Sequence, residues 1–212
     1  MNDTLAKTLS VVFHPLLMPT YLFGAFFYFS PETLGVDVIS LNTRLILLSF
    51  ISVCTFLVPS LLIYYMYRAG LIQTLELKTR SDRPLPLYLT ALIYAFFTYF
   101  FAKKLNPLSE IAPEIAWILG IMSISVLLVG VISQKWQISA HGTGIGGVLG
   151  ILAAVILKSG NTQLQLPLIA ALLMAGWVFS ARLSLNAHTA SQVYVGGGLG
   201  VVVSFLSVWY WF

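Results

Sequence analysis

Long apolar segments alternate with short polar ones along the whole chain. A helix needs about 20 predominantly apolar residues to cross the hydrocarbon core of a bilayer, and several segments approach or exceed that length. The predicted helices lie near Leu9–Phe29, Leu45–Tyr67, Leu85–Ala102, Ile115–Ser133, Thr143–Leu157, Leu166–Leu183 and His188–Phe212. The pattern therefore predicts an all-α fold, a polytopic transmembrane helix bundle of six or seven helices.

Proline and glycine positions add local detail to these helices. Pro15 and Pro19 lie inside the first segment, and we expect a bend there because proline removes a backbone donor. No cleavage pattern of small residues follows this segment, so we expect it to be retained. The fifth segment is short, and it extends back to Ser139 if the preceding polar residues form its first turn. Glycines at positions 196, 197, 198 and 200 would let another helix approach closely.

Composition indicates the same class of protein. The chain is 58% apolar and 8% charged, whereas soluble domains are about 25% charged. The formal net charge of +4 comes without a basic stripe interleaved with aromatic residues, which argues against a nucleic-acid partner. The single cysteine, Cys54, excludes an intrachain disulfide. Because the loops are too short to fold separately, residues 1–212 should form one membrane domain.

Three polar segments are expected on the same side of the membrane, because connections between successive membrane helices alternate between the two sides. With seven helices, the connections around residues 68–84, 134–142 and 184–187 all emerge at one face. Ionisable groups at membrane depth are costly and indicate a functional site. One of the three histidines, His14, lies elsewhere, beside Pro15 in the first helix, where we expect it to pack as a hydrogen-bonded side chain. The three connections and their flanks hold Lys78, Arg80, Arg83, Ser139, His141, Arg182 and His188.

Most of these side chains are cations, and few acidic residues lie near them. Glu76 and Asp82 are the acids in the first connection. Guanidinium groups match phosphate oxygens in geometry and charge, so the cluster predicts a binding site for a phosphate group. For Lys78 and Arg80 a second interpretation stays open, because basic loop residues are also typical of the positive-inside rule.

Three short motifs occur in order between residues 78 and 192. Their order, side of the membrane and shared chemistry resemble the signature motifs of the type 2 phosphatidic acid phosphatase superfamily. The resemblance spans about half of the chain. The motifs are Lys78-Thr79-Arg80-Ser81-Asp82-Arg83-Pro84, then Ser139-Ala140-His141, then Arg182 followed by His188.

The resemblance implies a metal-independent phosphatase that forms a covalent phosphohistidine. It implies that His188 is the nucleophile and that His141 protonates the leaving oxygen. These two roles are physically reasonable, because phosphoryl transfer needs mainly positioning and positive charge, and a neutral imidazole is a nucleophile near pH 7. The phosphate would be bound by Arg182, Arg83 and Lys78, together with Ser139 and nearby backbone amides such as that of Ala140.

The chain also departs from the family pattern. The family usually has an aspartate four residues after the nucleophilic histidine, and this chain has Gln192 there. On a helix, Gln192 would reach the ring of His188 and orient it without supplying a negative charge. Fewer residues than usual separate Lys78 from Arg83, and two predicted helices lie between the first two motifs.

Other patterns point to no further chemistry. The run Gly142-Thr143-Gly144-Ile145-Gly146-Gly147 has the spacing of a dinucleotide-binding turn, but no strand precedes it. No cysteine, histidine or carboxylate residues have metal-ligand spacing on a common helix. We therefore predict neither a metal nor a cofactor.

The main functional hypothesis is a phosphatase of the bacterial inner membrane that acts on a lipid phosphate or pyrophosphate. Isoprenyl pyrophosphates, phosphatidate-like lipids and lipid A phosphate are the candidate substrates. Gln192 keeps open an alternative, a non-catalytic binder or transporter of anionic lipids that retains the phosphate-binding cluster. An ion channel or a purely structural bundle is the third hypothesis.

Overall fold

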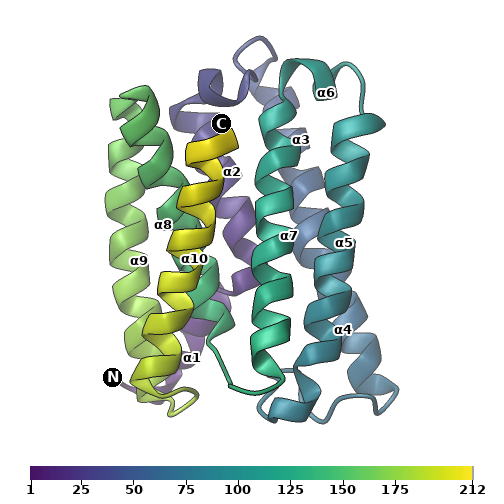
Figure 1. The fold of residues 1–212 in the computed structure, drawn as a ribbon, viewed down its shortest axis with the longest axis vertical. Coiled ribbons are helices and arrows are strands. Elements are labelled where there is room, and N and C mark those ends of the chain that lie inside the picture. The colour runs from purple at the N-terminus through teal and green to yellow at the C-terminus, as the bar shows by residue number, and fades with distance from the viewer. Residues whose placement is uncertain (212) are drawn as a thin grey trace.

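Seven helical spans lie side by side along the longest axis of the molecule (Figure 1). The computed structural model describes residues 1–211, and this part of the chain contains helices and no strand. The prediction of an all-α polytopic bundle is confirmed, and the chain is an integral membrane protein. The spans cover Asp3–Phe29, Leu41–Arg68, Arg80–Lys103, Pro113–Ser133, Ala140–Ser159, Thr162–Ser184 and Ala190–Trp211.

Several spans consist of more than one helical element. The first span contains α1 (Asp3–Val12), the 3-10 turn η1 (Pro15–Leu17) and α2 (Met18–Phe29), and the second contains α3 (Leu41–Ser52), the π-helical turn η3 (Val53–Leu57) and α4 (Val58–Arg68). The others are η4 (Arg80–Asp82) with α5 (Pro84–Lys103), α7 (Pro113–Ser133), α8 (Ala140–Ser159), η5 (Thr162–Leu164) with α9 (Gln165–Ser184), and α10 (Ala190–Trp211). Two short elements, η2 (Pro31–Leu34) and α6 (Leu108–Ile111), lie in connections.

The starts of α8 and α10 differ from the predicted ones in ways that concern the motif residues. α8 begins at Ala140, because Oγ of Ser139 accepts a hydrogen bond from N of Gly142 at 3.2 Å and caps the helix. The extension back to Ser139 that the sequence allowed is thus confirmed. α10 begins at Ala190, so His188 precedes the helix and does not open it.

The first span is interrupted beside Pro15, as predicted, and the interruption frees a backbone carbonyl. α1 ends at Val12, and N of His14 donates to the carbonyl of Val11 at 3.2 Å, which tightens the last turn. The carbonyl of Ser10, which His14 would meet in a continuous helix, is therefore available to a side chain from elsewhere. Pro19 lies in the first turn of α2, where a missing N–H is tolerated.

The second span contains a comparable irregularity, which Tyr94 of α5 stabilises. Pro59 has no N–H to donate to the carbonyl of Thr55 four residues earlier, and the chain makes a π-helical turn at this point. The buried hydroxyl of Tyr94 donates to that carbonyl at 2.7 Å. Since an unsatisfied carbonyl is costly inside a bilayer, this bond stabilises the contact between the second and third spans.

α8 and α10 pack against each other through glycines on both helices. A Cβ atom at Gly146 would lie 2.2 Å from the carbonyl oxygen of Gly197, and one at Gly200 would lie 2.2 Å from that of Thr143. Only glycine leaves room for two backbones at this separation. The glycine run that opens α8 is therefore a helix-packing surface, and it fixes the relative position of the segments that carry His141 and His188.

The three connections with motif residues lie at the same end of the bundle. This is the lower end in Figure 1, where the chain passes from α4 to α5, from α7 to α8 and from α9 to α10. The N-terminus lies at the same end, and α10 finishes at the other. The parity expected from seven helices is confirmed.

Gly200→Ala should destabilise the protein, whereas Gly198→Ala on the same helix should not. The new methyl group at position 200 would meet backbone atoms of α8, and overpacking of this kind typically costs about 1–3 kcal/mol. A Cβ at Gly198 has no neighbour within 4 Å, so the higher helix propensity of alanine should make that variant neutral or slightly more stable. Thermal unfolding in detergent measures both, and equal midpoints for the two variants would contradict the packing.

Candidate functional site

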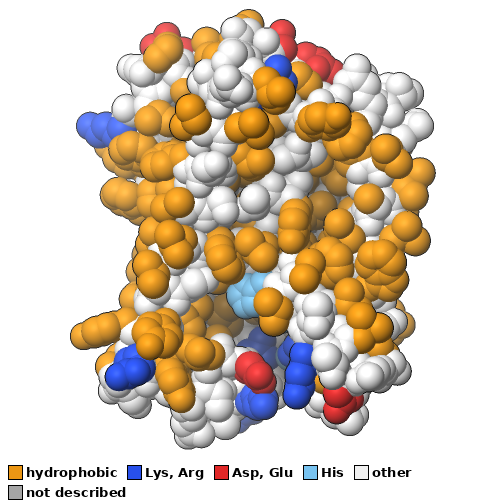
Figure 2. Space-filling model, turned by 180° about the vertical axis from the view of Figure 1, so that it is seen from behind, with side chains coloured by type: hydrophobic (Ala, Val, Ile, Leu, Met, Phe, Trp, Pro, Cys, Tyr) orange, Lys and Arg blue, Asp and Glu red, His pale blue; other side chains and the backbone are white. Residues whose placement is uncertain are grey.

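A cavity of about 860 Å³ occupies the lower half of the bundle. Figure 2 shows a hollow on one side of the molecule, with a histidine and several Lys or Arg side chains in and around it. Residues from all three motifs line the cavity, so the structure brings them together. They are Lys78, Arg83, Ala140, His141, Arg182 and His188.

Arg83 is held at the cavity wall by the connection between α7 and α8. It is 4% exposed, and Nη2 donates to the carbonyl of Ile138 at 2.6 Å. The neighbouring Asp82 does not neutralise it, because the Asp82 carboxylate accepts hydrogen bonds from N of Gln73 at 2.8 Å and Oγ of Ser81 at 3.3 Å. Arg83 is therefore a buried cation that is bonded to a neutral carbonyl.

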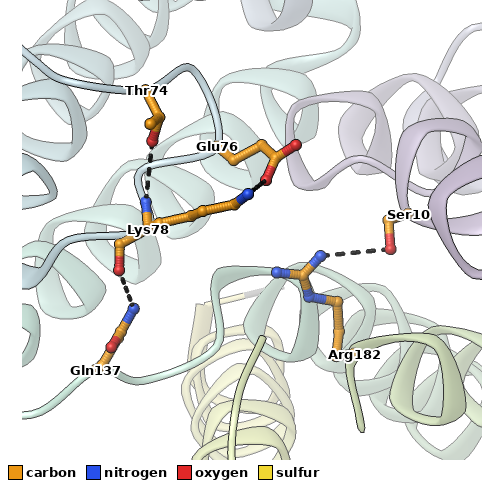
Figure 3. A network of polar contacts seen from close by, with 6 residues as sticks. All are labelled: Ser10, Thr74, Glu76, Lys78, Gln137 and Arg182. Carbon is orange, nitrogen blue, oxygen red and sulfur yellow. Dashed lines mark hydrogen bonds and ion pairs between the residues drawn. The ribbon is translucent and has the colours of Figure 1, made fainter. Parts of the chain in front are cut away.

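Two further hydrogen bonds join the first motif to the same connection. Nη1 of Arg80 donates to the carbonyl of Lys135 at 3.0 Å. Nε2 of Gln137 donates to the carbonyl of Lys78 at 2.8 Å, as Figure 3 shows. The first and second motifs thus form one unit, although α5 and α7 separate them in the sequence.

Arg182 reaches the cavity from the end of α9. Nη1 lies 3.4 Å from Oγ of Ser10 in α1 (Figure 3). The buried Nε of Arg182 has no hydrogen-bond partner within residues 1–211. Arg182 therefore has unused donors in a site where a missing partner is costly.

Lys78 differs from the two arginines, because it has an acidic partner. Its Nζ lies 2.9 Å from Oε2 of Glu76, and the two side chains are 69% and 70% exposed. This is the one ion pair in the described part of the chain. Lys78 is therefore exposed at the rim of the cavity. Because exposed ion pairs contribute little to stability, an anion would replace Glu76 as its partner at little cost.

Ser139 and Ala140 have different roles at the start of α8. Ser139 is fully buried, and its hydroxyl caps the helix while its N donates to the carbonyl of Gln192 at 3.1 Å. Ala140 lines the cavity. The positive end of α8 therefore lies beside the site, and the hydroxyl of Ser139 caps it.

His141 is oriented by the interrupted first span. Its Nε2 lies 3.0 Å from the carbonyl oxygen of Ser10, the group that the interruption beside Pro15 leaves free. A carbonyl only accepts hydrogen bonds, so Nε2 carries the hydrogen and Nδ1 is the nitrogen left for exchange with a ligand.

His188 is oriented by two acceptors. Its Nδ1 lies 3.1 Å from the carbonyl oxygen of Gln137 and 3.3 Å from Oε1 of Gln192. These contacts place the hydrogen on Nδ1 and leave a lone pair on Nε2. The ring therefore has the tautomer that a nucleophilic Nε2 requires.

Gln192 reaches His188 as expected, but from a capping box and not along a helix face. Oε1 accepts from N of Thr189 at 3.1 Å, and N of Gln192 lies 3.4 Å from Oγ1 of Thr189. A threonine followed three residues later by glutamine is a sequence signature of this cap. Gln192 thus both starts α10 and holds the ring of His188.

The charge environment keeps His188 neutral. Burial, together with the positive charges of Arg182 and Arg83, lowers the pKa of His188 from 6.5 to about 4. The hydrogen bonds to Gln192 and Gln137 act in the opposite direction and are outweighed. Near pH 7 the ring therefore keeps its lone pair.

His14 also lines the cavity, although the sequence predicted only hydrogen-bonded packing for it. Its Nδ1 accepts from N of Leu16 at 3.3 Å, and its ring centroid lies 5.6 Å from that of His141. The hydrogen bond was expected, and the position beside His141 was missed. The sequence did contain a signal for His14, because a histidine inside a membrane span is costly and indicates a functional role. Nothing in the sequence indicated a role for Ser10.

The cavity is strongly positive. Four basic residues and one acidic residue line it, a formal excess of three positive charges when the histidines are neutral. Low-dielectric walls strengthen the attraction of such a cleft for anions. Among the residues described, no group of three or more His, Cys, Asp or Glu is placed to hold a metal. The charged residues are Lys7, Lys78, Arg83, Arg182 and Glu76.

Comparisons with protein-family models, with curated proteins and with solved structures find no match to this chain. Function is therefore inferred from the cavity and its residues.

Gln192→Glu should raise the pKa of His188 from about 4 toward 6.5. The substitution preserves the shape of the side chain and the capping box, and it adds a negative charge that stabilises the protonated ring. NMR titration of ¹⁵N-labelled histidine measures the change, with Gln165→Glu at the other end of the bundle as the control. A His188 that already titrates near 6.5 in the unsubstituted protein would contradict the proximity of the arginines.

Proposed function

We propose that this protein is a membrane phosphohydrolase that removes phosphate from a lipid phosphate or pyrophosphate, with chemistry like that of the type 2 phosphatidic acid phosphatase superfamily. One observation supports this most directly. Arg83, Arg182, His141 and His188 come from three separate segments and line one cavity, and neither arginine has an ion-pair partner within residues 1–211. Such a site is suited to a phosphate group held beside a neutral imidazole.

In the first step, Nε2 of His188 attacks phosphorus, and a P–N bond forms as the bond to the leaving oxygen breaks. The hydrogen on Nδ1 stays bonded to the carbonyl of Gln137 and to Gln192, which stabilise the positive charge that the ring gains. Arg83 and Arg182 neutralise the charge on the oxygens that remain on phosphorus.

His141 carries the proton in both steps. Its Nε2 is engaged by Ser10, so Nδ1, when protonated, gives its proton to the leaving oxygen. Water then attacks phosphorus and the P–N bond breaks, while Nδ1 of His141 takes a proton from the water. The products are inorganic phosphate and an alcohol, or a lipid monophosphate when the substrate is a pyrophosphate.

The position of the site supports a lipid substrate. The hollow lies on the side of the bundle (Figure 2), and Val11 of α1 and Ile63 of α4 belong to its lining. A phosphate on a membrane lipid can therefore reach the arginines sideways. Isoprenyl pyrophosphates, phosphatidate-like lipids and lipid A phosphate all share this headgroup chemistry, and the bacterial inner membrane is the proposed location.

A second candidate function is a binder or transporter of anionic lipids without catalysis. The favouring observation is that His188 is held by two neutral acceptors, Gln137 and Gln192. A carboxylate in place of Gln192 would stabilise the developing imidazolium, and the amide does so less. The binder would keep its affinity for lipid phosphates when His188 is replaced.

The purified protein in detergent should release phosphate from lipid phosphates or pyrophosphates in the presence of a chelator. His188→Ala should abolish release, because the nucleophile is lost, and His141→Ala should lower it by at least about a hundredfold, the usual contribution of a positioned acid. A malachite-green assay over a substrate panel measures both.

Lipid-phosphate binding provides the control for these variants. Both should still bind a lipid phosphonate through Arg182, whereas Arg182→Gln should weaken that binding. Absence of phosphate release together with Arg182-dependent binding would reject the phosphohydrolase and support the binder.

A further inference from the structure

The cavity continues from the histidines and arginines deep into the bundle. Along α5 the residues that line the cavity run from Arg83, just before the helix, to Tyr94. Along α8 they run from Ala140 to Ile151. Each pair is eleven residues apart in the sequence, which is about 16 Å along a helix axis. The hydrocarbon core of a bilayer is about 30 Å thick. The cavity therefore extends from the membrane surface to about the midplane, the depth of one lipid leaflet.

Charge is confined to the lower end of this space. The charged residues of the lining belong to α1, to the connection that carries the first motif and to the end of α9. The inner part is walled by α5, α7, α8 and α10, and Met122, Ile151 and Ser204 belong to its lining. The lining thus changes along the cavity from cationic to uncharged.

The hydroxyl groups that α5 and α7 contribute to the inner wall are bonded within the protein. Oγ1 of Thr90 donates to the carbonyl of Pro86 at 2.8 Å, and Oγ of Ser125 donates to the carbonyl of Ile121 at 2.9 Å. The hydroxyl of Tyr94 is bonded to the second span. Because these hydrogens are used within the protein, the α5 and α7 side of the inner wall offers little to a polar ligand and suits a hydrocarbon.

We propose that the inner part of the cavity binds the hydrocarbon tail of the phosphorylated ligand, so that the tail lies inside the bundle while the phosphate lies at Arg83 and Arg182. The identity of the headgroup rests on the proposed function. A volume of about 860 Å³ falls in the usual range for a site that encloses one small molecule. The ligand class is therefore a single-chain lipid phosphate or pyrophosphate, alkyl or isoprenoid, with a tail about one leaflet long.

α7 offers a matched pair of substitutions that tests this placement. Val126 lines the inner cavity, and Val131 on the same helix is 50% exposed on the outside of the bundle. Val126→Phe fills the path of the tail and leaves the arginines untouched. Val131→Phe makes the same chemical change where it meets only lipid or detergent.

The experiment compares binding of butylphosphonate and dodecylphosphonate, whose P–C bond resists hydrolysis. Val126→Phe should bind butylphosphonate like the unsubstituted protein, which also shows that it is folded, and should bind dodecylphosphonate at least tenfold more weakly. Val131→Phe should bind both normally. Because all three proteins share one detergent, partition of the tail into micelles cancels. Normal binding of dodecylphosphonate by Val126→Phe would overturn the proposal.

A labelling experiment gives a second answer that needs no variant. Dodecylphosphonate with a diazirine at the end of its tail should label residues around Met122 and Ile151, and excess unlabelled dodecylphosphonate should suppress the label. Labelling confined to exposed residues such as Trp177 would place the tail in the surrounding lipid and would reject the inference.

Phosphate release from dodecyl phosphate separates this inference from the proposed function. Length-selective phosphonate binding without release would leave the tail site standing and reject the phosphohydrolase. Phosphate release at an equal rate by Val126→Phe and by the unsubstituted protein would support the phosphohydrolase and reject the tail site.

Discussion

A bilayer core contains no water, so a backbone carbonyl that leaves the helical pattern there must find a donor within the protein. In this molecule side chains of the candidate site supply donors to one such carbonyl in the first span and to two carbonyls in the connection between α7 and α8. His141 bonds to the carbonyl of Ser10, Arg83 to that of Ile138 and His188 to that of Gln137. The non-helical backbone around the site and the orientation of its polar side chains therefore depend on the same bonds.

The fold was largely accessible from the sequence, because the length of an apolar segment is set by the bilayer and not by tertiary contacts. The expectation of six or seven spans followed from that length, and seven spans in turn predicted the common face of the motif connections. The break beside Pro15 was equally local. The π-helical turn before Pro59 was not, because the bond that stabilises it comes from Tyr94 on another span.

The candidate site was accessible in part. The order of the motifs predicted the convergence of Arg83, His141, Arg182 and His188, which share one cavity. The place of His14 was missed, because its proximity to His141 depends on how α1 and η1 pack against α8. The capping box of Gln192 could have been recognised in the local sequence, but the residue had been interpreted as a partner of His188 or as helix packing.

The hollow on the side of the bundle has a kinetic consequence. A ligand that enters there from a leaflet never passes through bulk water, so it meets the site by two-dimensional diffusion. Occupancy is then set by the mole fraction of the ligand among its neighbouring lipids and not by its molar concentration. Adding inert lipid at constant total ligand would lower saturation, as surface dilution does for other processes confined to a membrane plane.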